Sequence, residues 1–560
     1  MLITVLPLTT RGIHMDITRR ESFKMLGGAA AIAALPISFS SLSAEQKNSL
    51  VTNGYVAVDR ASAHQFEGLT VAFNQRWTAS NCQVIYFCVS PDGVKNALQS
   101  LITEGTHKTS FSVKSGGHCY EDFVFNDSIT AIIDTSYLKG GGALEDGTFY
   151  GEAGLTNWEA GKMFYKQLGK CIPGGTCYSV GIGGHIVGGG FGVLSRLHGL
   201  TVDQLEAVEV ATVDAFDVVT LNECHRNDAD PLKQDLFWAH CGGGGGNFGI
   251  ITKYIFKSTL PDAPNYSDIT RLAVSWENIP DPATFRDIVR LYTSSIQTWP
   301  NELYCAANFN HEYNGNIDFD IVSSFDDVAT GDSLYTTYIR KFFDDLTNLG
   351  VSPFSTNGPG DGVQRLGYLD AVEVRGAIVG GTRNKFKSCH MREDFPEHHL
   401  NTFYTYLRTP IVDANSNPVD FYANVQMHTY GGAINDIAPD ATPDAARDSF
   451  IKMQYIINWK QMLNGSDGWD DACLTWMNDL YSTTYTGYPN NEPAPDFLDP
   501  ETQTVVVDGC YVGYCDKDLV DWPTLYYGEN YTRLQYIKND WDPQNLFNHA
   551  QSIVGTPRPL

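Results

Sequence analysis

The sequence is poor in positive charge. Its 560 residues include 38 lysines and arginines against 65 aspartates and glutamates, which gives a formal net charge of −27 at pH 7. The acidic residues are spread along the chain and do not form a tail. Such a charge repels phosphate backbones and anionic membrane surfaces. We therefore expect no nucleic-acid partner, and a neutral or cationic small molecule as the ligand.

Several motifs are also missing. No GxxxxGK[ST] segment is present, which excludes a P-loop NTPase. The twelve cysteines show no CxxC pair of the kind that binds zinc, so we expect no metal. The apolar run at residues 25–37 is too short to span a bilayer, and no membrane insertion is expected. There is no internal repeat.

The N-terminus resembles an export signal. Arg19 and Arg20 precede the apolar run and a serine-rich stretch that ends at Ala44. Paired arginines before a weakly apolar segment are typical of twin-arginine signals, although a frayed helix is the alternative. We expect residues 1–44 to be such a signal, starting at Met1 or Met15, and the protein to be periplasmic or secreted. Because that route exports folded proteins, we interpret most cysteines as buried small residues.

The remaining chain divides into three parts. In residues 51–257, short β-rich runs alternate with helices, with strands expected at 83–89, 110–114 and 130–134 and a helix at 91–102. A capping box, Thr156 with Glu159, predicts a further helix that ends near Gly169.

Residues 258–499 lack glycine clusters and are more polar and aromatic. We expect a second domain here, an antiparallel sheet backed by helices, with a strand at 422–428 and an amphipathic helix at 446–464. Residues 500–560, with a strand at 504–507, are expected to return to the first domain.

Two glycine-rich segments dominate the first part, at Pro173–Gly192 and Gly242–Gly249. Glycine lets backbone N–H groups approach a bulky anion and form nests for phosphates. Gly244–Gly249 satisfies GxGxxG, but it follows a helical segment at 235–239 and leads into a strand at 250–256. This reverses the strand–glycine–helix order of the dinucleotide fold, so the glycines are expected to bind a ligand within another fold.

Five ordered segments resemble the berberine-bridge-enzyme-like FAD-linked oxidases of the vanillyl-alcohol-oxidase superfamily. They are Val113–His118, Pro173–Gly192, Asp235–Trp238 running into Gly242–Gly249, Tyr430–Gly432 and Tyr527–Leu534. The resemblance covers nearly everything after the signal. It implies an α+β fold, with a two-part FAD-binding domain of the PCMH type plus a substrate domain with an antiparallel sheet backed by helices.

The resemblance also implies FAD held by two covalent bonds. His118 would bond the 8α-methyl carbon (8α-histidyl) and Cys177 would bond ring carbon C6 (6-S-cysteinyl). An imidazole nitrogen and a thiolate are good nucleophiles toward an electrophilic ring. Taken alone, the histidine would be a turn residue and the cysteine an inert core residue.

Further FAD contacts are implied along the same motifs. The pyrophosphate would be held at Ser115, Gly116, Gly117, Gly174 and Gly175, and the flavin and ribityl chain at Gly181, Gly183, Gly184 and His185. Gly249 and Ile250 would lie near the adenine, and Tyr527 and Asn530 near the flavin ring.

The implied reaction is oxidation of an alcohol, with hydride passing to flavin N5 and dioxygen reoxidising the flavin to give hydrogen peroxide. The family's Tyr-x-Asn-Tyr-x-Asp segment corresponds to residues 511–516, with Gly513 in place of the asparagine, and Tyr514 is predicted to be the base. A free tyrosine has a pKa of about 10, so the site must depress it. A cross-strand aromatic is the alternative interpretation of Tyr514.

The substrate pocket is predicted from fewer signals. Phe191 stands where some relatives carry a second tyrosine, and Gln426 and His428 share one strand face. We expect a sugar, an oligosaccharide or a glycosylated metabolite as substrate. A flavin dehydrogenase with a non-oxygen acceptor, or a flavin-loaded binding protein without turnover, are the alternatives.

Overall fold

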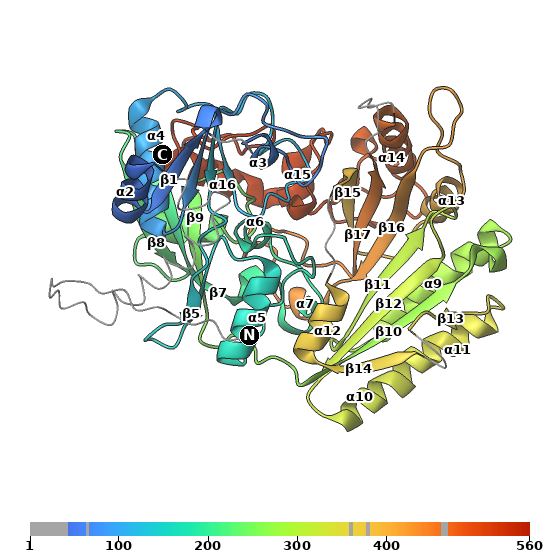
Figure 1. The fold of residues 1–560 in the computed structure, drawn as a ribbon. Coiled ribbons are helices and arrows are strands. Elements are labelled where there is room, and N and C mark those ends of the chain that lie inside the picture. Colours follow the sequence, from blue (N-terminus) through green and yellow to red (C-terminus); the bar gives the residue numbers. More distant parts are fainter. Residues whose placement is uncertain (1–42, 63–65, 358–361, 377–380, 461–468, 560) are drawn as a thin grey trace, which may run out of the picture.

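The computed structural model describes residues 43–62, 66–357, 362–376, 381–460 and 469–559. Nearly all of the predicted export signal, including Arg19 and Arg20, therefore lies outside the described residues. The described chain forms two lobes, which Figure 1 shows side by side. Strands β1 to β9 lie in the first lobe and strands β10 to β17 in the second.

The first lobe contains two sheets. A four-stranded sheet has the order β1 (Tyr55–Asp59), β2 (Val84–Cys88), β4 (Ala131–Asp134), β3 (Phe111–Lys114), and β4 runs parallel to both β2 and β3. All residues of β2 are buried, as expected for a strand covered on both faces. The antiparallel five-stranded sheet has the order β5 (Gly141–Ala143), β6 (Phe149–Glu152), β9 (Ile250–Phe256), β7 (Leu205–Val213), β8 (Val219–His225).

The helices of this lobe begin and end at the residues that favour helix termini. Ser90 caps α4 (Pro91–Glu104) at its start, and Gly105 ends it in the left-handed conformation. The predicted capping box of Thr156 and Glu159 opens α5 (Asn157–Leu168), which stops at Gly169. The order of α8 (Pro231–Ala239), glycine loop and β9 is also as predicted, so the GxGxxG match is not a dinucleotide turn.

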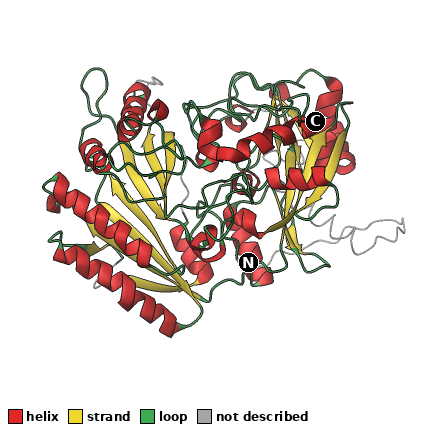
Figure 2. Cartoon of the chain, turned by 180° about the vertical axis from the view of Figure 1, so that it is seen from behind, coloured by secondary structure: helices red, strands yellow, loops and turns green. Residues whose placement is uncertain are grey.

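The second lobe is one antiparallel sheet of eight strands. Its order is β13 (Phe354–Ser355), β10 (Tyr266–Val274), β12 (Ile317–Phe325), β11 (Leu303–Asn310), β16 (Phe421–Thr429), β17 (Ile451–Trp459), β15 (Arg383–Met391), and β14 (Val363–Gly367) also pairs with β10. Helices cover its outer face (Figure 2), among them α9 (Pro282–Thr298), α11 (Arg340–Asn348), α13 (Glu397–Tyr406) and α14 (Asp470–Thr484). The predicted fold class is confirmed.

The C-terminal residues cross back to the first lobe. Helix α16 (Tyr531–Trp541) packs against α8, and Arg533 pairs with Asp235 across that contact at 2.7 Å. Lys538, which is buried, donates hydrogen bonds to the backbone oxygens of Asn247 and Phe547. The C-terminus thereby fixes the second glycine loop. No helix in the described ranges is long and apolar enough to cross a membrane.

Two predicted elements are wrong. The segment predicted as a helix at 446–464 contains strand β17, and residues 461–464 lie outside the described residues. Ile451, Met453 and Tyr455 alternate with Lys452 and Gln454, and all five are buried, so tertiary packing decides the conformation. The predicted strand at 504–507 forms only isolated bridges, of Val505 to Leu498 and Val507 to Met391.

Candidate active site

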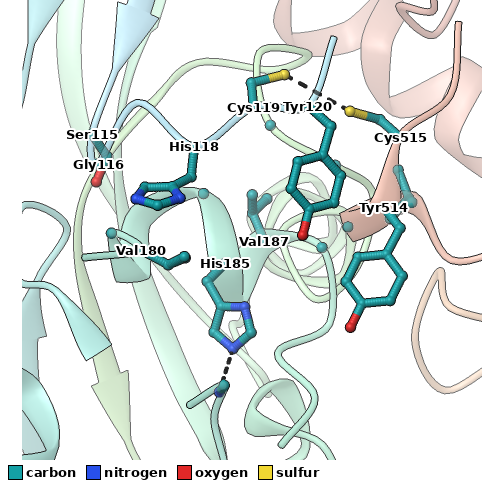
Figure 3. Close-up of a pocket in the computed structure, with 18 of the residues that line it drawn as sticks. Ser115, Gly116, His118, Cys119, Tyr120, Val180, His185, Val187, Tyr514 and Cys515 are labelled. Carbon is teal, nitrogen blue, oxygen red and sulfur yellow. Dashed lines mark hydrogen bonds between the residues drawn. The ribbon is translucent and has the colours of Figure 1, made fainter. Parts of the chain in front are cut away.

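A cavity of about 860 Å³ lies where the two lobes meet. Loops of the first lobe line one side, the inner face of the eight-stranded sheet lines another, and residues 511–515 and 546–549 close it. Figure 3 shows part of its lining. Most of the predicted cofactor residues line this cavity: Ser115, Gly116, Gly117, His118, Gly175, Cys177, Gly181, Gly183, Gly184, His185, Gly249, Ile250 and Tyr527.

The Ser115–Gly117 loop and the glycine-rich segment Pro173–Gly192 touch each other closely. A Cβ atom on Gly116 would lie 2.3 Å from the backbone nitrogen of Gly181, and one on Gly181 would lie 2.3 Å from the Ser115 Oγ. Ser115 in turn donates a hydrogen bond to the backbone oxygen of Ala153. Only glycine permits this contact, which places both loops at one wall of the cavity.

His118 is held in place on two sides. Its ring stacks on Phe73 at a centroid distance of 4.1 Å, and Nε2 lies 2.9 Å from the Ser179 Oγ. Burial lowers the pKa of His118 to about 4. The imidazole is therefore neutral at pH 7 and keeps a nucleophilic nitrogen lone pair.

Cys177 is one of few cysteines that reach the cavity. All twelve cysteines lie in the described part of the chain, and nine of them are buried. Cys119, Cys177 and Cys515 are partly exposed, and all three line the cavity. Asn157 donates a hydrogen bond to the Cys177 backbone oxygen at 3.3 Å, which fixes the loop that carries the thiol.

Two predicted cofactor residues do not line the cavity. Gly174 lines a smaller neighbouring cavity. Asn530 is not a lining residue, because its amide donates to the backbone oxygens of Pro439 and Thr442 and is used to hold that loop. The FAD contact predicted for Asn530 therefore stays a prediction that no lining contact supports. Tyr527 does line the cavity, and its hydroxyl donates to the Gly243 oxygen at 2.9 Å.

Tyr514 lies across the cavity from His118, and its hydroxyl is directed into the cavity (Figure 3). Burial raises its pKa well above 10, with further contributions from Tyr120 and Tyr511. The expectation that the protein depresses this pKa is therefore wrong for the site without a bound ligand. The phenol is neutral there at pH 7.

A lysine that the sequence did not reveal lies over this tyrosine. Lys452 Nζ is 3.5 Å from the centroid of the Tyr514 ring and 4.2 Å from that of Tyr511. Lys452 is fully buried, and its Nζ has no hydrogen-bond partner among the described residues. Burial lowers its pKa well below 10.5, although Asp444 opposes that shift. An amphipathic helix over 446–464 would place its lysines toward solvent, so nothing in the sequence singles out Lys452.

The inner face of the sheet is rich in neutral polar groups. Gln426 and His428 both line the cavity, as predicted from their shared strand face, and Phe191 lies 5.7 Å from the His428 ring. Gln426 donates to Asn308 Oδ1 at 2.5 Å. Further amides and hydroxyls on neighbouring strands complete this face, which consists of Tyr304, Asn308, Tyr422, Asn424, Gln426, Gln454 and Asn458.

The cavity fits the FAD that the sequence motifs imply. A Cβ on Gly184 would meet no atom within 4 Å, so there is open space beside the backbone for a ligand. Among the described lining residues Asp320 is the only carboxylate, and it lies on β12, away from the glycine loops. The glycine wall therefore offers backbone amides to a pyrophosphate without an opposing charge.

Known proteins resemble this chain over nearly its full length. The profile described as "FAD binding domain" matches residues 83–220, and "Berberine and berberine like" matches residues 510–554. The hexose oxidase of Chondrus crispus is 32% identical over 89% of this chain and 96% of its own length. The aclacinomycin-N/aclacinomycin-A oxidase of Streptomyces galilaeus is 31% identical over 94% of each.

A solved structure agrees with the sequence comparison. The flavoenzyme CrmK of caerulomycin biosynthesis superposes with a TM-score of 0.79 and 32% identity, covering 90% of this chain and all of CrmK. The fold, the glycine-walled cavity and the two profiles lead to one conclusion. The chain belongs to the berberine-bridge-enzyme-like FAD-linked oxidoreductases.

Proposed function

We propose that this oxidoreductase is an oxidase of sugar-like alcohols that carries FAD bonded to both His118 and Cys177. The observation that carries the proposal is the position of His118, Cys177 and Tyr514 on one cavity opposite an amide-rich sheet face. Bound FAD supplies a hydride acceptor at N5, and we propose dioxygen as the final acceptor and hydrogen peroxide as the product.

The linking residues have the chemistry that covalent attachment needs. His118 is neutral at pH 7, and because Ser179 contacts Nε2, Nδ1 is the nitrogen proposed to form the bond. Cys177 is partly exposed on the same cavity and supplies the sulfur. Thiolate and imidazole nucleophiles on two sides would hold one planar ring in a fixed position.

The sheet face supports a polyhydroxylated substrate. Amide groups of Asn308, Asn424 and Gln454 offer both donors and acceptors and carry no charge, which suits sugar hydroxyls. The relatives named above include a hexose oxidase. A sugar, an oligosaccharide or a glycosylated metabolite is therefore the proposed substrate class.

Tyr514 is the proposed base for the substrate hydroxyl, and Lys452 is the group that makes it basic. Burial disfavours the charged form of each group, since it raises the pKa of the phenol and lowers that of the ammonium. When both are charged, the Tyr514 phenolate and the Lys452 ammonium compensate each other's buried charge. The distance of 3.5 Å from Lys452 Nζ to the centroid of the Tyr514 ring is short enough for this pairing. Tyr514 would then accept the hydroxyl proton while hydride leaves the carbon.

The attachment is tested by acid precipitation. Wild-type protein should retain its yellow colour in the pellet and show a mass increase of one FAD. His118→Ala and Cys177→Ala should each keep one bond and remain coloured, whereas the double variant should release FAD to the supernatant. Covalent flavin in the double variant would contradict the assignment.

The identity of the electron acceptor is tested by supplying hexoses and oligosaccharides to the enzyme in air. Oxygen uptake with an equal amount of hydrogen peroxide supports the oxidase. Turnover only with a quinone or another artificial acceptor would identify a dehydrogenase instead.

Export is a further part of the proposal, supported by Arg19 and Arg20 before the apolar run. The intact precursor should yield enzyme outside the cytoplasm, and the Arg19→Lys, Arg20→Lys double variant should remain inside. Equal distribution of both forms on cell fractionation would contradict this route.

A further inference from the structure

Two cysteines face each other beside the proposed catalytic groups. The Sγ atoms of Cys119 and Cys515 are 3.8 Å apart, although the residues are 396 positions apart in the sequence. Cys119 directly follows His118, and Cys515 directly follows Tyr514. Figure 3 shows the two thiols directed toward each other at the edge of the cavity.

Contacts that do not involve sulfur bring these segments together. Lys385, on β15, binds both Glu121 and Asp516 at 2.5 Å, and all three side chains are buried. Tyr120 stacks on Phe386 of the same strand, with a centroid distance of 4.0 Å. Each cysteine therefore lies within two residues of a buried anchor, so the sulfurs approach without help from a bond between them.

The two thiols are also accessible to a small oxidant. Nine of the twelve cysteines are buried, whereas Cys119 and Cys515 line the cavity. A disulfide needs a sulfur–sulfur distance of about 2.05 Å, and side-chain rotation supplies such a change without backbone movement when the sulfurs already touch. Cys177 lines the same cavity but is assigned to the flavin.

We propose that Cys119 and Cys515 form an oxidative modification site, a disulfide that ties the flavin-linking loop to the segment carrying Tyr514. The proposed oxidant is hydrogen peroxide, and only this source of oxidant rests on the proposed function. The Cys119 sulfur attacks one peroxide oxygen, which breaks the O–O bond, forms a sulfenic acid and releases water. The Cys515 sulfur then displaces the hydroxyl group as a second water. In sum, two thiols and one hydrogen peroxide give one disulfide and two waters.

The order of the two steps follows from the environment. The hydrogen bond shared with Cys119, together with burial, raises the pKa of Cys515 well above its ordinary value. Cys515 is therefore the poorer nucleophile toward free peroxide and acts second, when a sulfenic acid is already next to it.

The experiment uses the full-length holoenzyme. Protein reduced with dithiothreitol and desalted is treated with a small excess of hydrogen peroxide, denatured in N-ethylmaleimide, digested without reduction and mapped by mass spectrometry. We expect two fewer alkylated thiols per chain and a peptide pair joining Cys119 to Cys515. The melting temperature of the oxidised protein should exceed that of the reduced protein by a few degrees, because the bond closes a very long loop.

Two variants and one control accompany the wild type. Cys515→Ser and Cys119→Ser should give no crosslink and the same melting temperature with and without dithiothreitol. Cys224→Ser, which removes a buried cysteine on β8, should still form the crosslink. Free thiols at both positions after peroxide treatment of the wild type, or Cys119 joined to another cysteine, would overturn the proposal.

A second arm separates this proposal from the proposed function. Here a hexose in air replaces the added peroxide, and catalase is added to a parallel sample. A crosslink with the hexose that catalase suppresses supports both proposals. A crosslink with added peroxide but none with any sugar supports the modification site and counts against the oxidase alone.

Discussion

At the scale of single residues, the site depends on a buried lysine without a hydrogen-bond partner among the described residues, Lys452. Its Nζ lies over two tyrosine rings and also 4.7 Å from the ring of Phe191. A buried ammonium of this kind is costly unless a negative charge develops next to it. Tyr514 as a phenolate would supply that charge, so the two residues are best understood as one titrating pair.

Replacing this cation should change how activity depends on pH. The proposed base, Tyr514, can act only when deprotonated, and burial raises its pKa, so kcat/KM should rise with pH. Lys452→Met removes a desolvated cation–π contact worth about 2 kcal/mol, which corresponds to a fall of roughly 30-fold at neutral pH. The rising limb should move to higher pH, as measured by anaerobic flavin reduction.

The controls for this prediction separate charge from packing. Lys452→Arg keeps the cation and should recover part of the rate near neutral pH. Tyr514→Phe should slow flavin reduction by about 10²-fold or more at every pH, since no base remains. A Lys452→Met profile with the wild-type midpoint and only a lower plateau would show that the lysine has a packing role.

At the scale of secondary structure, local signals predicted the first lobe well. Ser90, Gly105 and the Thr156 capping box act within a few residues, and helices α4 and α5 begin and end where these residues indicate. Strand β17 was missed for the opposite reason. Both of its faces are buried, one against the helices and one against the cavity, so its polar residues do not mark a solvent-exposed face.

The site shows the same division between local and distant information. Motifs with a distinctive local sequence, such as Ser115–His118, could be singled out without the structure, and these residues line the cavity. The role of Asn530 depends on a loop some 90 residues away, and Lys452 reaches Tyr514 only through sheet pairing. No local pattern encodes those contacts, so the sequence indicated His118 and Cys177 but neither the loop contacts of Asn530 nor the lysine.

The contact of Gly181 with the Ser115–Gly117 loop gives a prediction at this scale. Gly181→Ala would place a Cβ 2.3 Å from the Ser115 Oγ and 2.5 Å from the Gly116 nitrogen, so the loops must separate. We expect the purified variant to carry several-fold less flavin, measured as absorbance per chain. Gly161→Ala, within α5, meets no atom within 4 Å and should load flavin as the wild type does. Normal loading of Gly181→Ala would show that the contact is dispensable.

At the scale of the whole molecule, three parts of the chain meet at one buried carboxylate. Asp516 comes from the C-terminal segment and pairs with Lys385 at 2.5 Å and Lys387 at 2.6 Å, both on β15 of the second lobe. Lys385 also binds Glu121 of the first lobe. This network holds the lobes together on either side of the cavity, with His118 and Tyr514 each within three residues of one of its members.

Asp516→Asn should therefore weaken the whole molecule and not only the active site. Breaking a buried ion pair by removing one partner costs about 3–5 kcal/mol, and here the buried Lys387 loses its carboxylate partner. Lys385 keeps Glu121 as a partner. Asp518→Asn is a matched control, since Asp518 also pairs with Lys385, at 2.8 Å, but is 43% exposed. The free energy of unfolding of Asp518→Asn should fall by no more than about 1 kcal/mol. Urea and thermal unfolding at neutral pH measure the stability of both variants against the wild type.

The pH dependence of the stability lost in Asp516→Asn tests whether the charge of Asp516 is the cause of that loss. Burial alone would raise the pKa of Asp516, but Lys387 and Lys385 outweigh it and lower the pKa to about 2. A carboxylate with a lowered pKa stabilises the fold above its unfolded pKa of about 3.9, and this contribution is lost as the pH falls toward 2. The gap in stability between wild type and Asp516→Asn should therefore be full at neutral pH and shrink below about pH 4. A gap that does not change with pH would mean that the asparagine disturbs packing, and that the charges of Lys385 and Lys387 do not depend on this carboxylate.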